Sequence, residues 1–196
     1  MTNPRKAGAA VEPLFLERWS PRAFDGSSIP EADLDAIFDG ARWAPSAFNY
    51  QPWRFVYARR DTPQFASFLE VLLPFNQSWA VNAGALVFVV SDTLIKSPYT
   101  GELTPAYSHS FDAGAAWALL ALQATRLGYH AHGMTGVNFD KAREVLGVPE
   151  RFRIEAAVAI GKQGDKASLP EALQAREAPS DRQTVAELAF EGAFKA

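Results

Sequence analysis

The segment ERWSPRAF places two arginines and a serine at alternate positions, Arg18, Ser20 and Arg22. Because Ser20 precedes a proline, its backbone is restricted to extended conformations. Side chains alternate along an extended chain, so these three residues are predicted to point to the same side. Two guanidinium groups and a hydroxyl group on one side can bind a phosphate or a polarised carbonyl group. The same pattern also occurs in solvated basic stretches, so it needs support from other segments.

A second polar segment, APSAFNYQPW, spans residues 44–53 and is stiffened near its ends by Pro45 and Pro52. Three of its side chains supply donors and acceptors that suit the edge of a polar heterocycle: Ser46, Asn49 and Gln51. Its aromatic rings can stack on a ligand or pack in the core, and we expect the core for Trp53. A plain connection between a helix and a strand needs none of these amide groups, so this loop is predicted to contact a ligand.

Other familiar chemistry is disfavoured by pattern. His130 and His132 share one face of a predicted strand, but no carboxylate stands at metal-ligand spacing, so we predict no metal site. The segment GMTGVNFD brings Gly133 and Gly136 between a strand and a helix, where backbone N–H groups can face a ligand. It is not a dinucleotide-binding fingerprint, and the chain contains no Walker lysine pattern and no G-x-S-x-G motif. The chain also has no cysteine, which excludes disulfides and thiolate catalysis.

The elements that must position these residues follow from hydrophobic periodicity. A helix is predicted from Ser28, with Ser28 and Glu31 as a capping box or Pro30 in its first turn, and it ends before Pro45. The strands are expected at WRFVYA, ALVFVVS, YHAHGM and IEAAVAIG. Further helices are expected from Thr62 to a stop at Pro74, over residues 112–127 and around DKAREVLG. The helix over 112–127 carries small or apolar residues on most of its surface, so we expect it to be buried nearly all round.

The length fits one domain over residues 1–196, and the alternation of helices with short strands predicts an α+β or α/β sandwich with a central sheet. Residues 1–12 are expected to form a flexible leader, and residues 162–196 a C-terminal arm. The net charge of -3 argues against nucleic-acid and anionic-membrane partners. With no apolar segment near the N-terminus resembling a signal peptide and none long enough to span a bilayer, we expect a cytoplasmic protein.

The order and spacing of these segments resemble the FMN-dependent nitroreductase family. The likeness runs from RWSPRAF through APSAFNYQPWRF, PFNQSWAVNAGALVFVV and SFDAGAAWALLALQATRLGYHAHGMTGVNFD to the C-terminal DRQTVAELAFEGAF. The resemblance implies an α+β fold, a three-layer α-β-α sandwich with a central, mostly antiparallel sheet. It also implies an intertwined homodimer with FMN at the subunit interface, in which the proline-rich loop lines the flavin of the neighbouring subunit.

The resemblance also implies cofactor-binding roles. Arg18, Trp19, Ser20 and Arg22 match the motif that holds the FMN phosphate and the N1/C2 edge of the flavin. The loop residues Pro45, Ser46, Ala47 and Asn49 match the part of the partner subunit that covers the ribityl chain and the ring. Asn76 matches an amide at the pyrimidine edge, Gly136 a backbone N–H near flavin N5, and Arg182 a phosphate ligand. Trp79, Thr135 and Ser180 replace residues that some relatives carry as lysine, glutamate and a basic residue.

The activity that the resemblance implies is ping-pong hydride transfer. NADH or NADPH reduces the flavin at N5 and leaves, and a nitroaromatic, quinone or activated alkene takes the hydride, with no obligatory protein acid or base. Two alternatives stay open: a non-catalytic flavin-binding or sensor protein, and a specialised relative such as a dehalogenase or a flavin-cleaving enzyme.

Residues 92–110 show no clear periodicity and are long for a simple connection. The segment contains residues that are typical of turns, namely Pro98, Gly101 and Pro105. In the resembled family, material between these elements often covers the flavin face where substrates stack, and this segment is therefore expected to be a lid. Tyr107 and Phe111 are predicted to border the acceptor pocket.

Overall fold

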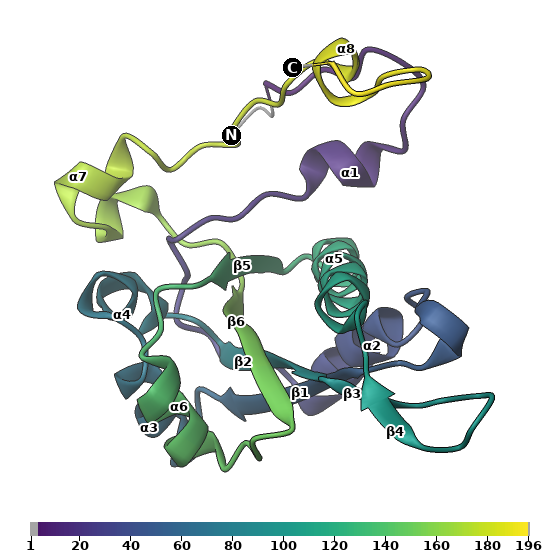
Figure 1. Ribbon diagram of the computed structural model, residues 1–196. Coiled ribbons are helices and arrows are strands. Elements are labelled where there is room, and N and C mark those ends of the chain that lie inside the picture. Colours follow the sequence, from purple (N-terminus) through teal and green to yellow (C-terminus); the bar gives the residue numbers. More distant parts are fainter. Residues whose placement is uncertain (1–3, 196) are drawn as a thin grey trace.

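The computed structural model describes residues 4–195 and has four antiparallel strands at its centre. Their order across the sheet is β1 (Trp53–Arg59), β2 (Ala85–Asp92), β6 (Phe152–Gly161) and β5 (His130–Met134). Helices α2 (Glu31–Ala41) and α5 (His109–Arg126) pack on one face of the sheet (Figure 1). Helices α3 (Gln64–Glu70), α4 (Pro74–Ala80) and α6 (Phe139–Leu146) pack on the other. The predicted three-layer α+β sandwich is confirmed.

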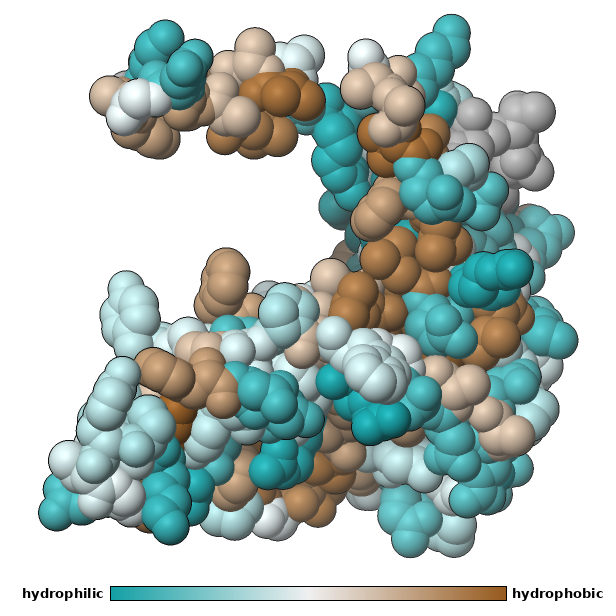
Figure 2. Space-filling model, turned by 90° about the vertical axis from the view of Figure 1, so that its right-hand side faces the viewer, coloured by the Kyte–Doolittle hydropathy of each residue, from teal (hydrophilic) through white to brown (hydrophobic). Residues whose placement is uncertain are grey.

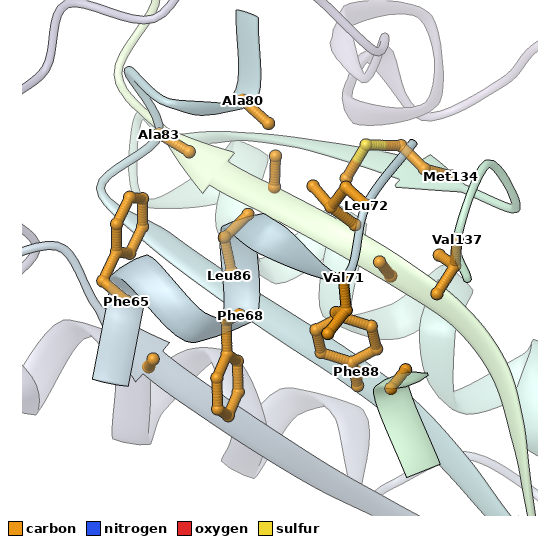
Figure 3. Packing of buried hydrophobic residues seen from close by; sticks show 14 of the residues in the cluster. Phe65, Phe68, Val71, Leu72, Ala80, Ala83, Leu86, Phe88, Met134 and Val137 are labelled. Atoms are coloured by element: carbon orange, nitrogen blue, oxygen red, sulfur yellow. The ribbon is translucent and has the colours of Figure 1, made fainter. Parts of the chain in front are cut away.

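Strand β2 is buried along its whole length because both faces of the sheet are covered. Its residues alternate between two cores: Leu86 and Phe88 pack with α3 and α4, whereas Val87 and Val89 pack with α2 and α5. Figure 3 shows the first of these cores, in which Phe65 and Phe68 of α3 and Leu72 lie over the strands. This two-sided burial explains why the strand is continuously apolar in the sequence.

Two helix boundaries differ in detail from the sequence prediction. Helix α2 begins after Pro30, which occupies the N-cap, and no side-chain hydrogen bond caps it, so the capping box of Ser28 and Glu31 does not form. Pro74 does not stop the preceding helix, since α3 already ends at Glu70. Pro74 instead stands in the first turn of α4, a position where its missing N–H costs no hydrogen bond.

The segment without sequence periodicity forms a β-hairpin. Strand β3 (Leu94–Lys96) pairs antiparallel with β4 (Leu103–Pro105), and Gly101 between them has φ 73°. Such short strands carry too few residues for a period of two to stand out, which is why the sequence did not reveal them. The hairpin leads directly into α5.

Helix α5 is not buried all round in one chain, contrary to expectation. Its inner face packs in the core through Ala113, Ala116 and Leu120, but Gly114 and Ala118 are exposed. Phe111 at its start is 83% exposed. One apolar face of the central helix is therefore open.

Residues 4–12 and the segment around α8 (Val185–Leu188) form an arm that stands away from the sandwich (Figure 1). Residues 4–12 and α1 (Pro13–Glu17) lie beside the C-terminal segment. The α7 helix (Glu171–Gln174) of that segment packs on the sandwich, since Leu173 belongs to the core formed with α3 and α4. Figure 2 shows an open space between the arm and the body. Within residues 4–195, no helix combines the length and apolar character needed to cross a bilayer.

Candidate cofactor site

Two adjoining cavities meet at Arg18 and Ser20, which line both. The first has a volume of about 320 Å³ and is mostly polar; the second has about 590 Å³ and is mostly apolar. They lie where the chain leaves α1, beside β5. Their volumes fall in the range of small-molecule sites in proteins.

The polar cavity contains five arginines from three separate segments of the chain. Its lining consists of Arg5, Arg18, Trp19, Ser20, Arg22, His132, Arg176, Ala178, Ser180 and Arg182. Arg18 Nη1 lies 3.4 Å from Ser20 Oγ, so the extended backbone does turn these side chains to one side. Guanidinium groups gathered in this way form a site for a phosphate or another compact anion.

Glu177 fixes the backbone of this cavity. Its Oε1 accepts hydrogen bonds from the backbone N–H groups of Arg22 (2.7 Å) and Ala23 (2.8 Å). Its Oε2 lies 4.0 Å from Arg22 Nη1, in an ion pair whose carboxylate is fully buried. Arg22 Nε and Glu177 Oε2 are buried with no hydrogen-bond partner among residues 4–195, which is costly unless a ligand or water completes the site.

Mutual repulsion among the cations marks the cavity as a place that favours an anion. Burial lowers the pKa of Arg18, and the neighbouring charges of Arg5 and Arg182 lower it further. Burial also lowers the pKa of Arg22, with Arg176 adding to the effect and Glu177 opposing it. A bound anion would relieve this repulsion.

His132 lies in the same cavity and ties strand β5 to the arginine motif. Its Nδ1 is 2.8 Å from the carbonyl oxygen of Pro21, and its ring packs on Trp79 with 4.6 Å between centroids. Burial lowers the pKa of His132 to about 4, and Arg22 contributes in the same direction. The imidazole is therefore neutral at physiological pH, and its Nδ1–H donates to Pro21.

The apolar cavity lies between α5 and the end of β5. It is lined by Phe15, Arg18, Ser20, Trp117, Ala118, Ala121, Leu122, Gly133, Met134, Thr135 and Ala156. Small and apolar side chains over this area leave room for a flat, largely apolar ligand.

Gly136 follows Thr135 of the apolar cavity in the chain, and Asn76 contacts it. Asn76 Nδ2 donates to the carbonyl oxygen of Gly136 at 3.1 Å, and Asn76 is 8% exposed. A Cβ at position 136 would stand 2.4 Å from Asn76 Nδ2, so this approach requires glycine. Neither residue lines the two cavities described above.

The proline-rich loop lies elsewhere in the same chain. Pro45, Ser46, Ala47 and Asn49 sit at the N-terminal end of α5, where Ala47 N–H donates to Asp112 Oδ2 at 3.2 Å. The loop is strained, since Phe48, Asn49 and Gln51 have φ of 52°, 53° and 53°. Non-glycine residues in this conformation concentrate at functional sites.

Tyr107 and Phe111 lie near this same end of α5 and line neither cavity. Tyr107 is 103% and Phe111 83% exposed. The site residues predicted from the sequence thus fall into three groups. Arg18, Trp19, Ser20, Arg22 and Arg182 line the polar cavity. Asn76 and Gly136 contact each other outside both cavities, and the proline-rich loop lies with Tyr107 and Phe111 at the N-terminal end of α5.

Three residues of the polar cavity had not been recognised as ligands from the sequence. Arg5 belongs to the predicted leader, Arg176 to the C-terminal arm, and His132 was weighed only as a metal ligand. No motif marks Arg5 or Arg176. The alternation of His130 and His132 along one strand was the single signal that could have drawn attention to His132.

Comparison with known proteins agrees with this geometry. The family model described as the nitroreductase family matches residues 16–162. A solved structure of an oxidoreductase containing FMN is 53% identical, covers 100% of this chain and 98% of its own, and superposes with a TM-score of 0.95. The "CLA biosynthesis enone reductase" of Lactiplantibacillus plantarum is 29% identical over 76% of this chain and 83% of that protein. A NADH dehydrogenase of Thermus thermophilus is also 29% identical, over 74% and 83%.

The family match covers most of the sandwich and includes the arginine–serine motif, both central helices and all four strands of the sheet. The chain belongs to the nitroreductase family.

Proposed function

We propose that this protein is an FMN-dependent oxidoreductase that takes a hydride from NADH or NADPH and delivers it to a nitroaromatic, quinone or activated-alkene acceptor. The observation that carries this proposal is the pair of cavities joined at Arg18 and Ser20. One is rich in arginines and the other is apolar, which matches a ligand with a phosphate at one end and a flat ring system at the other.

The residues present fit FMN on independent grounds. Arg22 Nε is a buried donor with no hydrogen-bond partner within residues 4–195, and an acceptor oxygen of a ligand would complete its hydrogen bonding. Burial lowers the pKa values of Arg18 and Arg22, and the positive charges of neighbouring arginines lower them further, so an anion would stabilise both cations. A phosphate supplies the negative charge and the acceptor oxygens together.

Each residue has a role that follows from its place. Arg18, Ser20 and Arg182 would hold the phosphate. Arg22, which lines the same cavity and is tethered by Glu177, would place a cation near the ring, a role taken from the family motif that it matches. When bound, FMN supplies the hydride chemistry, and a cation close to the ring favours negative charge there. Asn76 of α4 and the backbone at Gly136 would contact the ring edge, as the family motif implies.

The proposed electron donor and the proposed acceptor class are inferred from the names of two relatives. The Thermus thermophilus relative is named a NADH dehydrogenase, and the Lactiplantibacillus plantarum relative an enone reductase. An enone is an activated alkene, so the second name supports that acceptor class. Tyr107 and Phe111 remain predicted as borders of the acceptor pocket, and the hairpin β3–β4 as its lid.

We further propose that the functional unit is a homodimer. The loop with Ser46 and Asn49 is separate from both cavities of its own chain, so it can contact a flavin only in a second subunit. The open face of α5 and the space beneath the arm provide the surfaces that a second copy would cover (Figure 2).

The proposal is tested on the purified full chain. We expect a yellow protein with bound FMN that oxidises NADH or NADPH in the presence of menadione, a nitroaromatic or an enone. Arg22→Ala should lower FMN content and slow reduction by NAD(P)H, since a charge-assisted contact contributes roughly 1.5–3 kcal/mol. Lys141→Ala, which removes an exposed charge on α6, is the matched control.

Different outcomes separate the alternatives. Bound FMN without turnover of any acceptor would indicate a flavin-binding or sensor protein instead of an enzyme. A product other than the reduced acceptor would indicate a specialised reaction. Absence of flavin binding would contradict the proposal that FMN is the cofactor.

A further inference from the structure

Arg5 connects the N-terminal leader to both halves of the polar cavity. Its Nη1 donates to the carbonyl oxygens of Arg18 at 2.7 Å and Leu16 at 3.2 Å. Its Nε donates to the carbonyl oxygen of Ser180 at 2.8 Å. One guanidinium group therefore joins segments that are 13 and 175 residues away in the sequence.

These contacts fall on the residues that shape the cavity. The carbonyl oxygen of Arg18 belongs to the residue whose side chain lines both cavities, and Ser180 lies two residues before Arg182. Arg182 Nη1 in turn donates to Ser180 Oγ at 2.9 Å. Holding the Arg18 and Ser180 backbones together thus sets the spacing between the Arg18 and Arg182 guanidinium groups.

Arg5 also adds charge to the cavity that it lines. It lies close enough to Arg18 for its charge to lower the pKa of Arg18. The pKa of Arg5 is lowered by burial first and by Arg182 second, while Asp181 opposes this. The three arginines therefore share one electrostatic environment.

We propose that Arg5 is a positioning residue for the phosphate end of the cofactor, and that through Arg18 and Arg182 it gives the protein its preference for FMN over riboflavin. This inference rests on the proposed function. Riboflavin has the same ring and ribityl chain but no phosphate, so a residue that shapes only the phosphate end affects the two ligands differently.

The position of Arg5 makes a general structural role a poor explanation. Neither hydrophobic core includes any residue of 4–12, and the leader lies on the arm (Figure 1). Replacing Arg5 should leave the packing of the sandwich unchanged while loosening the arm next to Arg18.

The experiment measures flavin dissociation constants. The full chain is freed of flavin and titrated separately with FMN and with riboflavin, and binding is followed by the change in flavin fluorescence. Arg5→Ala should weaken FMN binding about tenfold, the effect of losing roughly one charge-assisted interaction, and leave riboflavin binding within about twofold.

Arg5→Lys keeps the charge and some donors, so it should recover part of the preference for FMN over riboflavin. Lys6→Ala removes the neighbouring positive charge, which does not line the cavity, and should match the wild type.

The outcomes are distinct. Equal weakening of FMN and riboflavin would assign Arg5 a purely structural role, and unchanged FMN affinity would remove any role; either result overturns the inference. If Lys6→Ala loses as much FMN affinity as Arg5→Ala, only the net charge of the leader matters and the positioning role is wrong. A wild-type protein that binds neither flavin would instead overturn the proposed function.

Discussion

A neutral imidazole surrounded by arginines is the least expected residue of the cavity. His132 is held by Pro21 through Nδ1 and by Trp79 through its ring, and burial keeps its pKa at about 4. A protonated ring would add a further cation to a site that already holds five. Its hydrogen bond to Pro21 fixes the extended backbone between Ser20 and Arg22. The ring therefore helps to hold the arginine–serine motif in place without adding charge.

His132 should make the stability of the fold pH-dependent. The unfolded chain binds a proton at His132 near the ordinary histidine pKa of about 6.5, whereas the folded chain does so only near pH 4. Stability is therefore complete above pH 6.5 and falls as the pH drops toward 4, by on the order of 2–3 kcal/mol. His130, whose pKa burial also lowers, acts in the same direction.

His132→Asn tests this by chemical denaturation at several pH values. The asparagine amide can still donate to Pro21 but does not titrate, so the loss of unfolding free energy between pH 7 and 4.5 should be smaller than in the wild type. Adding His130→Asn should reduce it again. A variant whose pH profile coincides with the wild-type profile would show that His132 is not buried in the neutral form.

Without the family resemblance, which pointed to Trp19 and Arg182, single residues of the cavity were predictable only where local backbone geometry decides their direction. The Ser20–Pro21 bond restricts the chain to an extended form, and this was sufficient to place Arg18, Ser20 and Arg22 on one side. Arg5 and Arg176 reach the same cavity through long-range folding. No spacing rule encodes a contact between residues 175 positions apart.

Among the elements, the strained loop and the start of α5 form one unit. Asp112 is 3% exposed and accepts hydrogen bonds from Ala47 N–H at 3.2 Å and from Ser108 Oγ at 2.9 Å. The left-handed conformation of Phe48 costs roughly 1–2 kcal/mol, so the loop needs such anchors to keep its shape. The helix thus positions the loop that is proposed to face the partner's flavin.

Asp112→Ala should destabilise the protein by about 1–3 kcal/mol, because the Ala47 N–H loses its acceptor. Ser108→Ala removes one hydroxyl donor and keeps the Asp112–Ala47 bond, so its cost should be no more than about 1 kcal/mol. Denaturant unfolding gives both values, and faster amide hydrogen exchange at Ala47 in Asp112→Ala alone would locate the change. Equal effects of the two variants would mean that Asp112 does not anchor the loop.

The elements that periodicity predicts well are those that are long or buried on both faces, such as α2, α5 and β2. The role of Pro74 was ambiguous, because a proline suits the end of a helix and the first turn of a helix equally. The prediction that Pro74 ends the preceding helix was wrong, since it stands in the first turn of α4. The hairpin β3–β4 was missed since its strands have three residues each. Short elements depend on tertiary context that a single sequence does not display.

At the scale of the whole molecule, one chain leaves its central helix half covered. Gly114 and Ala118 of α5 are exposed, and large rings on nearby segments are too: Trp43 and Phe48 at 71%, and Phe111 at 83%. Apolar surface of this extent usually marks an interface. The sequence indicated the apolar character of α5 on most of its surface, but a single chain cannot show which part a second copy covers.

Gly114 offers a direct test of the proposed dimer. A Cβ at this position meets no atom within 4 Å in its own chain, so Gly114→Arg should not disturb the protomer. Arginine is also a better helix former than glycine. If the open face of α5 packs against a second copy, the buried charge should raise the dimer dissociation constant at least about a hundredfold. FMN content should fall with it, since the proline-rich loop then no longer reaches the partner's site.

Ala66→Arg, which also replaces a small exposed residue by arginine but on α3 across the sheet, is the matched control. Sedimentation velocity at low micromolar concentration should show the wild type and Ala66→Arg at twice the 21.4 kDa of one chain, and Gly114→Arg as a folded monomer. A wild-type monomer that retains flavin would contradict the dimer, and a Gly114→Arg dimer would place the interface on another surface.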